Sequence, residues 1–405
     1  MGGEWPEGWQ RVKLSDAGQW LSGGTPSTAN DAYWGGEIPW ISAASLKDFH
    51  IGHSDRRVTP LGARNGSRLV EAGAVLFVVR GMSLKSEFRI GVSGRQVAFG
   101  QDCKAIIPAE GIDPQFLAHA IQVRTPQILA MVEETSHGTG RLDTERLQEL
   151  EIGVPSEEVQ RRIIAAHGVV ERRIAALERV RAKLKAVEGA LTVEAFGSID
   201  SHGLKVPLES IATVTAGVTL GSEPVGEDVI ELPYLRVANV LDGRIDTTNL
   251  KKVRILRSQY ERYALRSGDL LLTEGGDMDK LGRGAVWDGR IEQCLHQNHV
   301  FKVRCGDEML PDFLALYTSS KAGRAYFQSV GKQTTNLASI NSTQVKSMPV
   351  PVASLAQQEK VLGPIRSVRS RIAVTDRRIA KLRIVQRGML ESLLSGNVGS
   401  TLVYA

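Results

Sequence analysis

Hydrophobic residues follow two patterns that alternate twice along the chain. From residue 1 to about 155, short runs of Val, Ile, Leu and Phe, such as Ala74–Val79, are separated by Gly, Pro, Asn and Asp. The same pattern returns between about 200 and 353. Short apolar runs bounded by turn-forming residues predict short strands. Within each region one helix is expected, near 114–123 and near 311–319.

Each strand-rich region is followed by a long segment that is poor in glycine and proline. Between about 157 and 196 apolar residues recur every seven positions. Between about 356 and 394 two such series interleave, with Thr375 and Gln386 as their polar members. Alternating spacings of four and three are typical of the a and d positions of a coiled coil. The predicted seam residues are Ile163, Val170, Leu177, Leu184, Leu191, Val361, Ile365, Val368, Ile372, Ile379, Leu382 and Met389.

The ends of these two helices carry their own signals. Gly197 and Gly396 stand where C-terminal caps are expected. Gly363–Pro364 predicts a kink or a late start in the second helix, because proline lacks the amide N–H. Each helix would be about 60 Å long at ~1.5 Å per residue. A single apolar stripe of that length requires a partner helix, so we expect the two helices to pair.

The chain contains an internal repeat with an offset of about 194 residues. Glu37–Ile41 aligns with Glu231–Leu235, and Phe116–Ala118 aligns with Phe313–Ala315 after small insertions. An ordered series of such matches indicates a duplicated domain and helix, not a chance similarity. The second copy departs from the first at Gly217–Leu220.

The predicted fold class is α+β: two mixed α/β domains separated by two long helices in an antiparallel intramolecular coiled coil with pseudo-twofold symmetry. An antiparallel pairing would hold the domains apart, since both helices leave their domains at equivalent points. The expected boundaries are residues 1–155 for the first domain, 156–199 for its helix, 200–353 for the second domain, 354–397 for its helix and 398–405 for a tail.

Composition narrows the function only slightly. The 405-residue chain has a net charge of +5 and a pI near 9.1, which suits a nucleic-acid partner without requiring one. Three scattered cysteines form neither a disulfide framework nor a zinc motif, and they indicate a reducing compartment. No signal peptide and no apolar run of ~20 residues is found. We therefore expect a cytoplasmic location and no membrane contact.

Enzyme motifs are missing from the sequence. No dinucleotide-binding or phosphate-binding glycine loop, no zinc-protease helix and no Asn-Pro-Pro-aromatic motif of adenine methyltransferases occurs. Gly275–Gly276 and Gly282–Gly284 are interpreted as a turn or flexible loop, because no strand-to-helix context with a phosphate-binding Lys follows. His296 and His299 have no third ligand at regular spacing, so polar loop or strand positions are favoured over a metal site.

Several motifs make the chain resemble a known family. They are Gly24–Ser27, Tyr33–Trp40, Gly268–Leu271, and a Val-Pro pair followed by Gln160 or Gln358 at the start of each long helix. In this order, and partly twice over, the chain resembles the DNA specificity subunit of type I restriction-modification systems.

The resemblance implies a function as well as a fold. Each domain would be a target-recognition domain for one half of a bipartite, asymmetric site in double-stranded DNA. The helices would fix the gap between the half-sites and dock two modification (methyltransferase) subunits, which in turn join restriction subunits. S-adenosylmethionine would be used by the methyltransferase subunits, and the chain itself would hold no cofactor and catalyse nothing.

DNA contact requires groups that donate hydrogen bonds to phosphate and side chains that can pair with base edges, and several residues of this chain have them. Most of them lie in two loops of each domain, at equivalent places in the repeat. The candidates are Thr25, Ser27, Arg80, Ser83, Lys85, Arg89, Thr139, Arg141, Thr219, Arg236, Asn239, Lys280, Arg283, Lys332, Gln333, Thr334 and Asn336. A solvated surface loop is the alternative for each residue taken alone. The basic face of the second helix is either an outer coiled-coil face or a surface for acidic partners or DNA.

A second function remains open beside the first. The same plan would suit a non-catalytic interaction scaffold, in which a coiled coil presents two protein-binding domains. Nothing in the sequence speaks for an enzyme. Steep salt dependence of DNA binding would distinguish the DNA-binding subunit from the scaffold.

Overall fold

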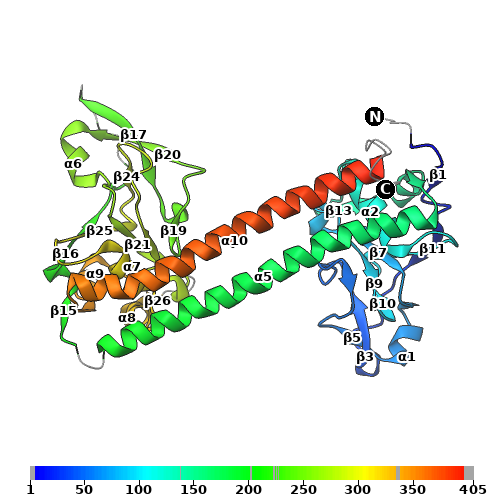
Figure 1. Cartoon of the computed structure of the whole chain (residues 1–405), viewed down its shortest axis with the longest axis horizontal. Helices are drawn as coiled ribbons and strands as arrows, with labels where there is room; N and C mark the ends of the chain where they lie inside the picture. Colours follow the sequence, from blue (N-terminus) through cyan, green and yellow to red (C-terminus); the bar gives the residue numbers. More distant parts are fainter. Residues whose placement is uncertain are drawn as a thin grey trace. The chain divides into compact units, whose positions relative to one another are not determined.

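The computed structural model describes residues 5–136, 138–200, 203–221, 224, 226, 228–333 and 338–395. The chain divides into two compact units. Unit 1 comprises Met1–Glu178 and Arg377–Ala405, and unit 2 comprises Arg179–Asp376. Each unit is therefore built from one domain together with part of both long helices (Figure 1).

Unit 1 is built on a five-stranded central sheet, flanked by a four-stranded sheet. The central order is β2 (Gly18–Ser22), β11 (Cys103–Pro108), β7 (Val75–Val78), β9 (Ile90–Ser93) and β4 (His50–Ile51). The flanking order is β5 (Arg57–Val58), β3 (Trp34–Ile41), β10 (Val97–Phe99) and β6 (Arg68–Val70). The helices of the domain are α1 (Pro60–Arg64), α2 (Pro114–Val123), α3 (Thr125–Leu129) and α4 (Thr144–Gln148).

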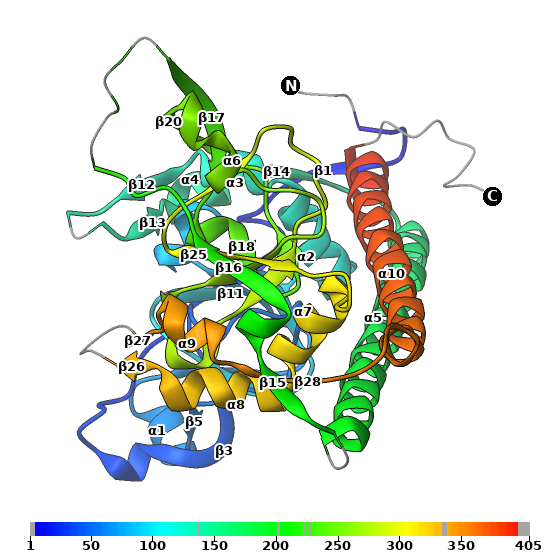
Figure 2. The same cartoon turned by 90° about the vertical axis from the view of Figure 1, so that its left-hand side faces the viewer.

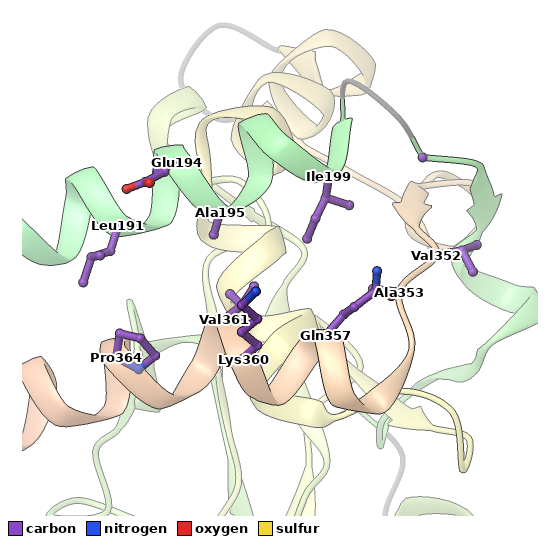
Figure 3. A pocket seen from close by; sticks show the side chains of 11 residues that line it. Leu191, Glu194, Ala195, Ile199, Val352, Ala353, Gln357, Lys360, Val361 and Pro364 are labelled. Atoms are coloured by element: carbon purple, nitrogen blue, oxygen red, sulfur yellow. The ribbon is translucent and has the colours of Figure 1, made fainter.

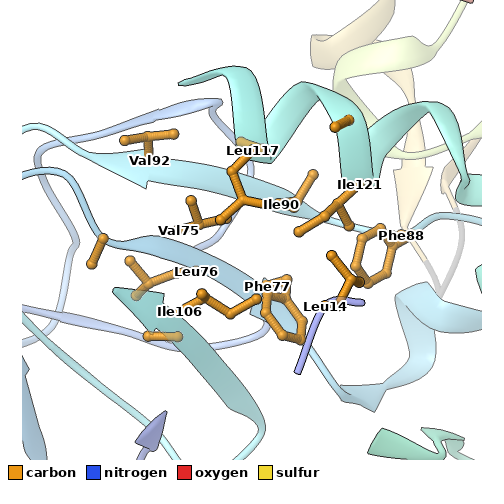
Figure 4. Close-up of a cluster of buried hydrophobic side chains, with 14 of the residues drawn as sticks. Leu14, Val75, Leu76, Phe77, Phe88, Ile90, Val92, Ile106, Leu117 and Ile121 are labelled. Atoms are coloured by element: carbon orange, nitrogen blue, oxygen red, sulfur yellow. The ribbon is translucent and has the colours of Figure 1, made fainter. Parts of the chain in front are cut away.

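The core of unit 1 lies between α2 and the central sheet (Figure 4). Leu117 and Ile121 of α2 face Val75 and Phe77 of the central strand β7, and all four side chains are buried. Every residue of β7 is buried, so its continuous apolar run fits a strand that is covered on both faces. Near the end of the domain, β14 (Glu151–Val154) pairs antiparallel with β1 (Gln10–Lys13), which brings the two ends of the domain together.

Unit 2 repeats this plan. Its central order is β16 (Ala212–Ala216), β25 (Val300–Cys305), β21 (Leu270–Thr273) and β23 (Gly284–Val286). Its second sheet is β20 (Lys251–Leu256), β17 (Val229–Leu235) and β24 (Leu295–His296). Two short pairs are β18 (Val240–Leu241) with β19 (Arg244–Ile245), and β15 (Lys205–Pro207) with β28 (Pro349–Pro351). The helices are α6 (Tyr260–Tyr263), α7 (Pro311–Ser319), α8 (Lys321–Val330) and α9 (Ser342–Lys346).

Local details also recur in the two units. Helices α2 and α7 have the bounds that the sequence predicted, and each begins with proline at its first turn, where the lost N–H costs nothing. Gly73 and Gly268, which lead into β7 and β21, both have a positive φ, 92° and 95°. An added Cβ at either position would meet the proline that begins α2 or α7, at 3.5 or 3.6 Å.

The two long helices are α5 (Glu157–Asp200) and α10 (Leu355–Ser395), which confirms the predicted mixed fold with two long helices. Helix α10 begins at Leu355 and runs through Pro364, so of the two expected outcomes, a kink or a late start, the late start is wrong. Helix α5 continues past Gly197, so this glycine is not its cap. Glycine inside a helix costs only about 1 kcal/mol relative to alanine, which is too little to end a helix by itself. Gly396 lies outside the described residues. Neither these two nor any other described helix combines the length and apolar character needed to cross a membrane.

The helices pair antiparallel within each unit (Figures 1 and 2). In unit 2, Nη1 of Arg181 lies 3.2 Å from Oδ1 of Asp376. Nε of Arg369 lies 2.6 Å from Oε1 of Glu188. Residue numbers thus rise along α5 as they fall along α10. In unit 1 the early part of α5 joins the core together with Leu390 near the end of α10.

A buried glutamine ties the start of each long helix to its domain. In unit 1 the Oε1 of Gln160 accepts a hydrogen bond from the N–H of Asp113 at 2.8 Å. Its Nε2 donates to the carbonyl oxygens of Gly111 and Pro155, both at 2.9 Å. Gln160 is only 1% exposed.

Unit 2 has the same arrangement around Gln358. The side chain accepts from the N–H of Leu310 at 2.8 Å and donates to the carbonyls of Glu308 and Ala353, both at 2.8 Å. The glutamine at the start of each helix in the sequence therefore has a structural purpose: it joins the long helix to the N-terminus of α2 or α7.

Candidate nucleic-acid interface

A small three-stranded sheet in unit 1 brings the two predicted DNA-binding loops together. Its order is β12 (Val132–Glu134), β13 (Gly140–Leu142) and β8 (Arg80–Gly81). The loop that follows β8 contains Ser83 and Lys85, and the β12–β13 hairpin contains Thr139. Segments about 50 residues apart in the sequence thus form one surface.

Two arginines occupy directly opposed positions in this sheet. Arg141 of β13 pairs with Arg80 of β8 on one side and with Glu133 of β12 on the other. All three side chains are exposed, whereas Gly140 and Leu142 on the opposite face of β13 are buried. Opposed residues of neighbouring strands have Cβ atoms about 5 Å apart, and like charges there are unfavourable. Neither arginine has an ion pair with another described residue.

Unit 2 contains an equivalent sheet with different side chains. Its order is β22 (Gly275–Gly276), β27 (Ala338–Ser339) and β26 (Lys332–Gln333). Ser339 pairs with Gly275 on one side and with Lys332 on the other. Ser339 thus takes the place of Arg141, Gly275 that of Arg80, and Lys332 that of Glu133. Lys332 and Gln333 are exposed. Thr334 and Asn336, also expected here, lie outside the described residues.

Other candidate cations are partly neutralised within the chain. Nζ of Lys85 lies 2.8 Å from Oε1 of Glu134. Nε of Arg89 lies 2.8 Å from Oε2 of Glu87, and its Nη1 donates to the carbonyl of Ala43. Lys280 of unit 2 pairs with Asp277. These three contribute less net positive charge to a DNA-facing surface than the sequence suggests. Arg283 is half-buried and forms no ion pair with a described residue.

The remaining candidates lie on other elements. Thr25 and Ser27 lie between β2 and β3, and Thr219 follows β16. Arg236 donates from Nη2 to the carbonyl of Asn249 at 2.9 Å. No hydrogen bond or ion pair joins these residues to the small sheets in the part of the chain that the structure describes.

Asn239 is a structural residue, which corrects its place among the DNA contacts. The side chain is 3% exposed. Its Oδ1 accepts from the N–H of Arg236 at 3.0 Å, and its Nδ2 donates to the carbonyl of Asp246 at 2.9 Å. An amide enclosed in this way shapes the β17–β18 turn and cannot reach a base.

The two histidines of the 296–299 segment are separated by their surroundings. His296 is buried and hydrogen-bonds the carbonyl of Val300 through Nδ1 at 2.7 Å, and burial lowers its pKa to about 4. His299 is exposed and pairs with Glu274. The described residues contain no group of three metal-ligating side chains.

The predicted seam residues are all buried or half-buried. A second series on α5 was not predicted: His167, Ile174, Arg181, Glu188 and Ala195 also face inward or are half-buried. Three of its five members are polar, so an apolar heptad could not reveal it. Arg181 and Glu188 are instead paired with charges on α10.

An open groove of about 620 Å³ lies in unit 2 between the last turns of α5 and the first turns of α10 (Figure 3). Leu191 and Ile199 project into it from α5, and Val361 and Pro364 line it from α10. Glu194 and Lys360 are the charged residues at its sides. The groove leaves apolar helix surface uncovered in the part of unit 2 that the structure describes.

Known proteins are similar to this chain both in sequence and in fold. Residues 6–186 match the family model of the type I restriction modification DNA specificity domain. The EcoR124I/EcoR124II specificity subunit from Escherichia coli is 30% identical over 153 residues, 37% of this chain and 38% of that protein. The EcoKI specificity subunit from Escherichia coli strain K12 is 23% identical over 386 residues, 89% of this chain and 82% of that protein. The first three relatives are matched over only 37% to 41% of their own length.

Solved structures share the fold along the whole chain. An S subunit of a type I restriction-modification system from M. genitalium has a TM-score of 0.54 at 14% identity, over 95% of this chain and 96% of that one. A chain from a study of complex assembly and conformational transition of the type I R-M system has a TM-score of 0.60 at 16% identity, over 98% and 100%. Over most of its length the chain is therefore similar to type I restriction-modification specificity subunits, the family that the repeated motifs indicated.

Proposed function

We propose that the protein is a sequence-specific DNA-binding subunit in which each unit contacts one half of a bipartite, asymmetric site. The observation that carries this proposal is the small sheet that occurs twice with the same strand order and different exposed side chains. A duplicated binding surface suits two half-sites, and different side chains suit two different base sequences.

The same proposal assigns the partners and the chemistry. Two modification (methyltransferase) subunits bind along α5 and α10 and bring S-adenosylmethionine, and restriction subunits join through them. Exposed apolar side chains on the helices, Val180, Val187, Ile384 and Val385, support protein contact there because charged residues are otherwise expected at such positions. The chain itself is non-catalytic and works in the cytoplasm.

The salt dependence of DNA binding tests this function against the scaffold. The chain is assembled with its modification subunit, and its affinity for genomic DNA fragments is measured from 50 to 300 mM salt. Each neutralised phosphate contributes about −0.9 to the slope of log K against log salt. A steep negative slope, together with retained preference for a subset of fragments, supports a DNA-specificity subunit. Binding that is independent of both salt and sequence supports the interaction scaffold.

A further inference from the structure

Arg80, Arg141 and Glu133 form an exposed row across the small sheet of unit 1, and side chains of these types can contact a G·C pair. We infer that Arg80 and Arg141 bind guanine in the major groove and that Glu133 accepts a hydrogen bond from cytosine. This inference rests on the proposed function and specifies which bases one half-site contains.

The geometry of the row supports major-groove contact. Arg80, Arg141 and Glu133 are directly opposed on three adjacent strands, so their side chains leave the same face of the sheet. Arg141 and Glu133 lie on the two strands of the β12–β13 hairpin, and the major groove, about 12 Å wide, admits a two-stranded ribbon. Arg80 lies on β8, the strand that borders this hairpin. The hairpin loop is held by hydrogen bonds from the N–H of Thr135 to the carbonyl of Thr139 and from Gly138 to Thr135, at 2.9 and 2.8 Å. These two bonds hold the described residues of the hairpin loop together.

The charges of the row favour bases over phosphates. Guanidinium groups that form no ion pair within the chain can bind either a base or a phosphate. Glu133, however, lies beside Arg141, and its carboxylate would repel a phosphodiester. Glu133 has no ion pair with another described residue that would cancel its charge. A carboxylate at a DNA surface is favourable where it meets the cytosine N4 amino group, and arginine is the usual partner of guanine O6 and N7.

Unit 2 provides an internal contrast. The equivalent row is Gly275, Ser339 and Lys332, which has no carboxylate and a single cation. This row cannot form the same pair of contacts. The two half-sites therefore differ at the positions that these rows face, and the guanine–cytosine requirement belongs to the half-site of unit 1.

Methylation maps of variants test the inference. The complex of the chain with its modification subunit methylates unmethylated genomic DNA, and the modified adenines are located by sequencing. Arg141→Ala and Arg80→Ala are each expected to lower discrimination at one G·C position of a single half-site by about 10-fold to 100-fold. The other half-site stays unchanged. Arg141→Lys keeps the charge but loses the two-pronged donor, so it should relax the same position.

Matched controls separate base contact from general effects. Arg95→Ala removes an exposed arginine in the β9–β10 turn and should leave the motif intact. Lys332→Ala should leave the unit 1 half-site intact. Arg141→Lys that preserves the motif, or arginine variants that weaken methylation equally at all sequences, would show phosphate contact and overturn the inference. Failure of the proposed function itself is distinct, since the wild-type complex would then give no bipartite motif.

Discussion

Replacing Gln160 with leucine should destabilise unit 1 by about 3 kcal/mol. The variant keeps the side-chain volume but removes three hydrogen bonds, to Asp113, Gly111 and Pro155. A buried group left without its partner costs about 1–3 kcal/mol. Gly111 is exposed, so water can replace the hydrogen bond to its carbonyl. The N–H of Asp113 and the carbonyl of Pro155 then lose their partner, and these two groups account for the loss of stability. For a unit of this size, 3 kcal/mol corresponds to a Tm lower by about 6–12 °C.

Thermal and urea unfolding of the full chain measure this loss. Gln358→Leu is the matched variant, because it removes the same three kinds of bond in unit 2, and it should produce a similar shift. Gln328→Leu changes an exposed glutamine on α8 and should stay within about 0.5 kcal/mol. If Gln160→Leu unfolds like the wild type within 1 kcal/mol, the glutamine does not anchor the helix, and the reasoning fails.

Two further variants test other parts of the account. His119 is 3% exposed, and burial lowers its pKa to about 3 from 6.5. The unfolded state therefore binds a proton first as pH falls below 6.5, and stability declines by up to about 1.4 kcal/mol per pH unit. His119→Leu, which introduces the residue found at Leu316 in unit 2, should flatten the dependence of urea midpoints on pH between 6.5 and 4; an unchanged slope would contradict this. Ile365→Ala in the seam should cost about 2–5 kcal/mol by the same assay, and a loss below 1 kcal/mol would show a seam that is not tightly packed.

The sequence predicted those elements whose signals are local. The bounds of α2 and α7 follow from apolar periodicity, and the two long helices follow from sustained heptads. Each signal lies within the segment that forms the element. The repeat added the equivalence of the two domains, since an alignment compares distant segments directly.

Features that depend on distant contacts could not be predicted. Strands β8 and β22 have two residues each, too few for a periodic pattern, so their pairing with β13 and β27 was hidden. The opposition of Arg80 and Arg141 depends on that pairing. Asn239 has the composition of a base-contacting residue, and only its burial shows that its amide holds a turn.

Polar seam positions illustrate the same limit. Arg181 and Glu188 interrupt any apolar series on α5, yet each is matched by an opposite charge on α10. The partner of each residue is about 190 positions away in the sequence. Only the antiparallel register reveals that these charges belong to the helix interface.

The central claim is tested most directly by measuring the length of the gap between the two half-sites. Residues 179–185 and 373–379 are deleted together, which removes one heptad from each helix and keeps the Glu178–Arg383 and Glu188–Arg369 pairs. Seven residues are about 10 Å of helix, or up to ~3 base pairs of DNA at ~3.4 Å each. The methylation map of the wild-type complex should show a bipartite motif with a fixed gap, and the deletion should shorten the gap with both half-sites unchanged. A contiguous motif, or a gap that ignores the deletion, would contradict the account.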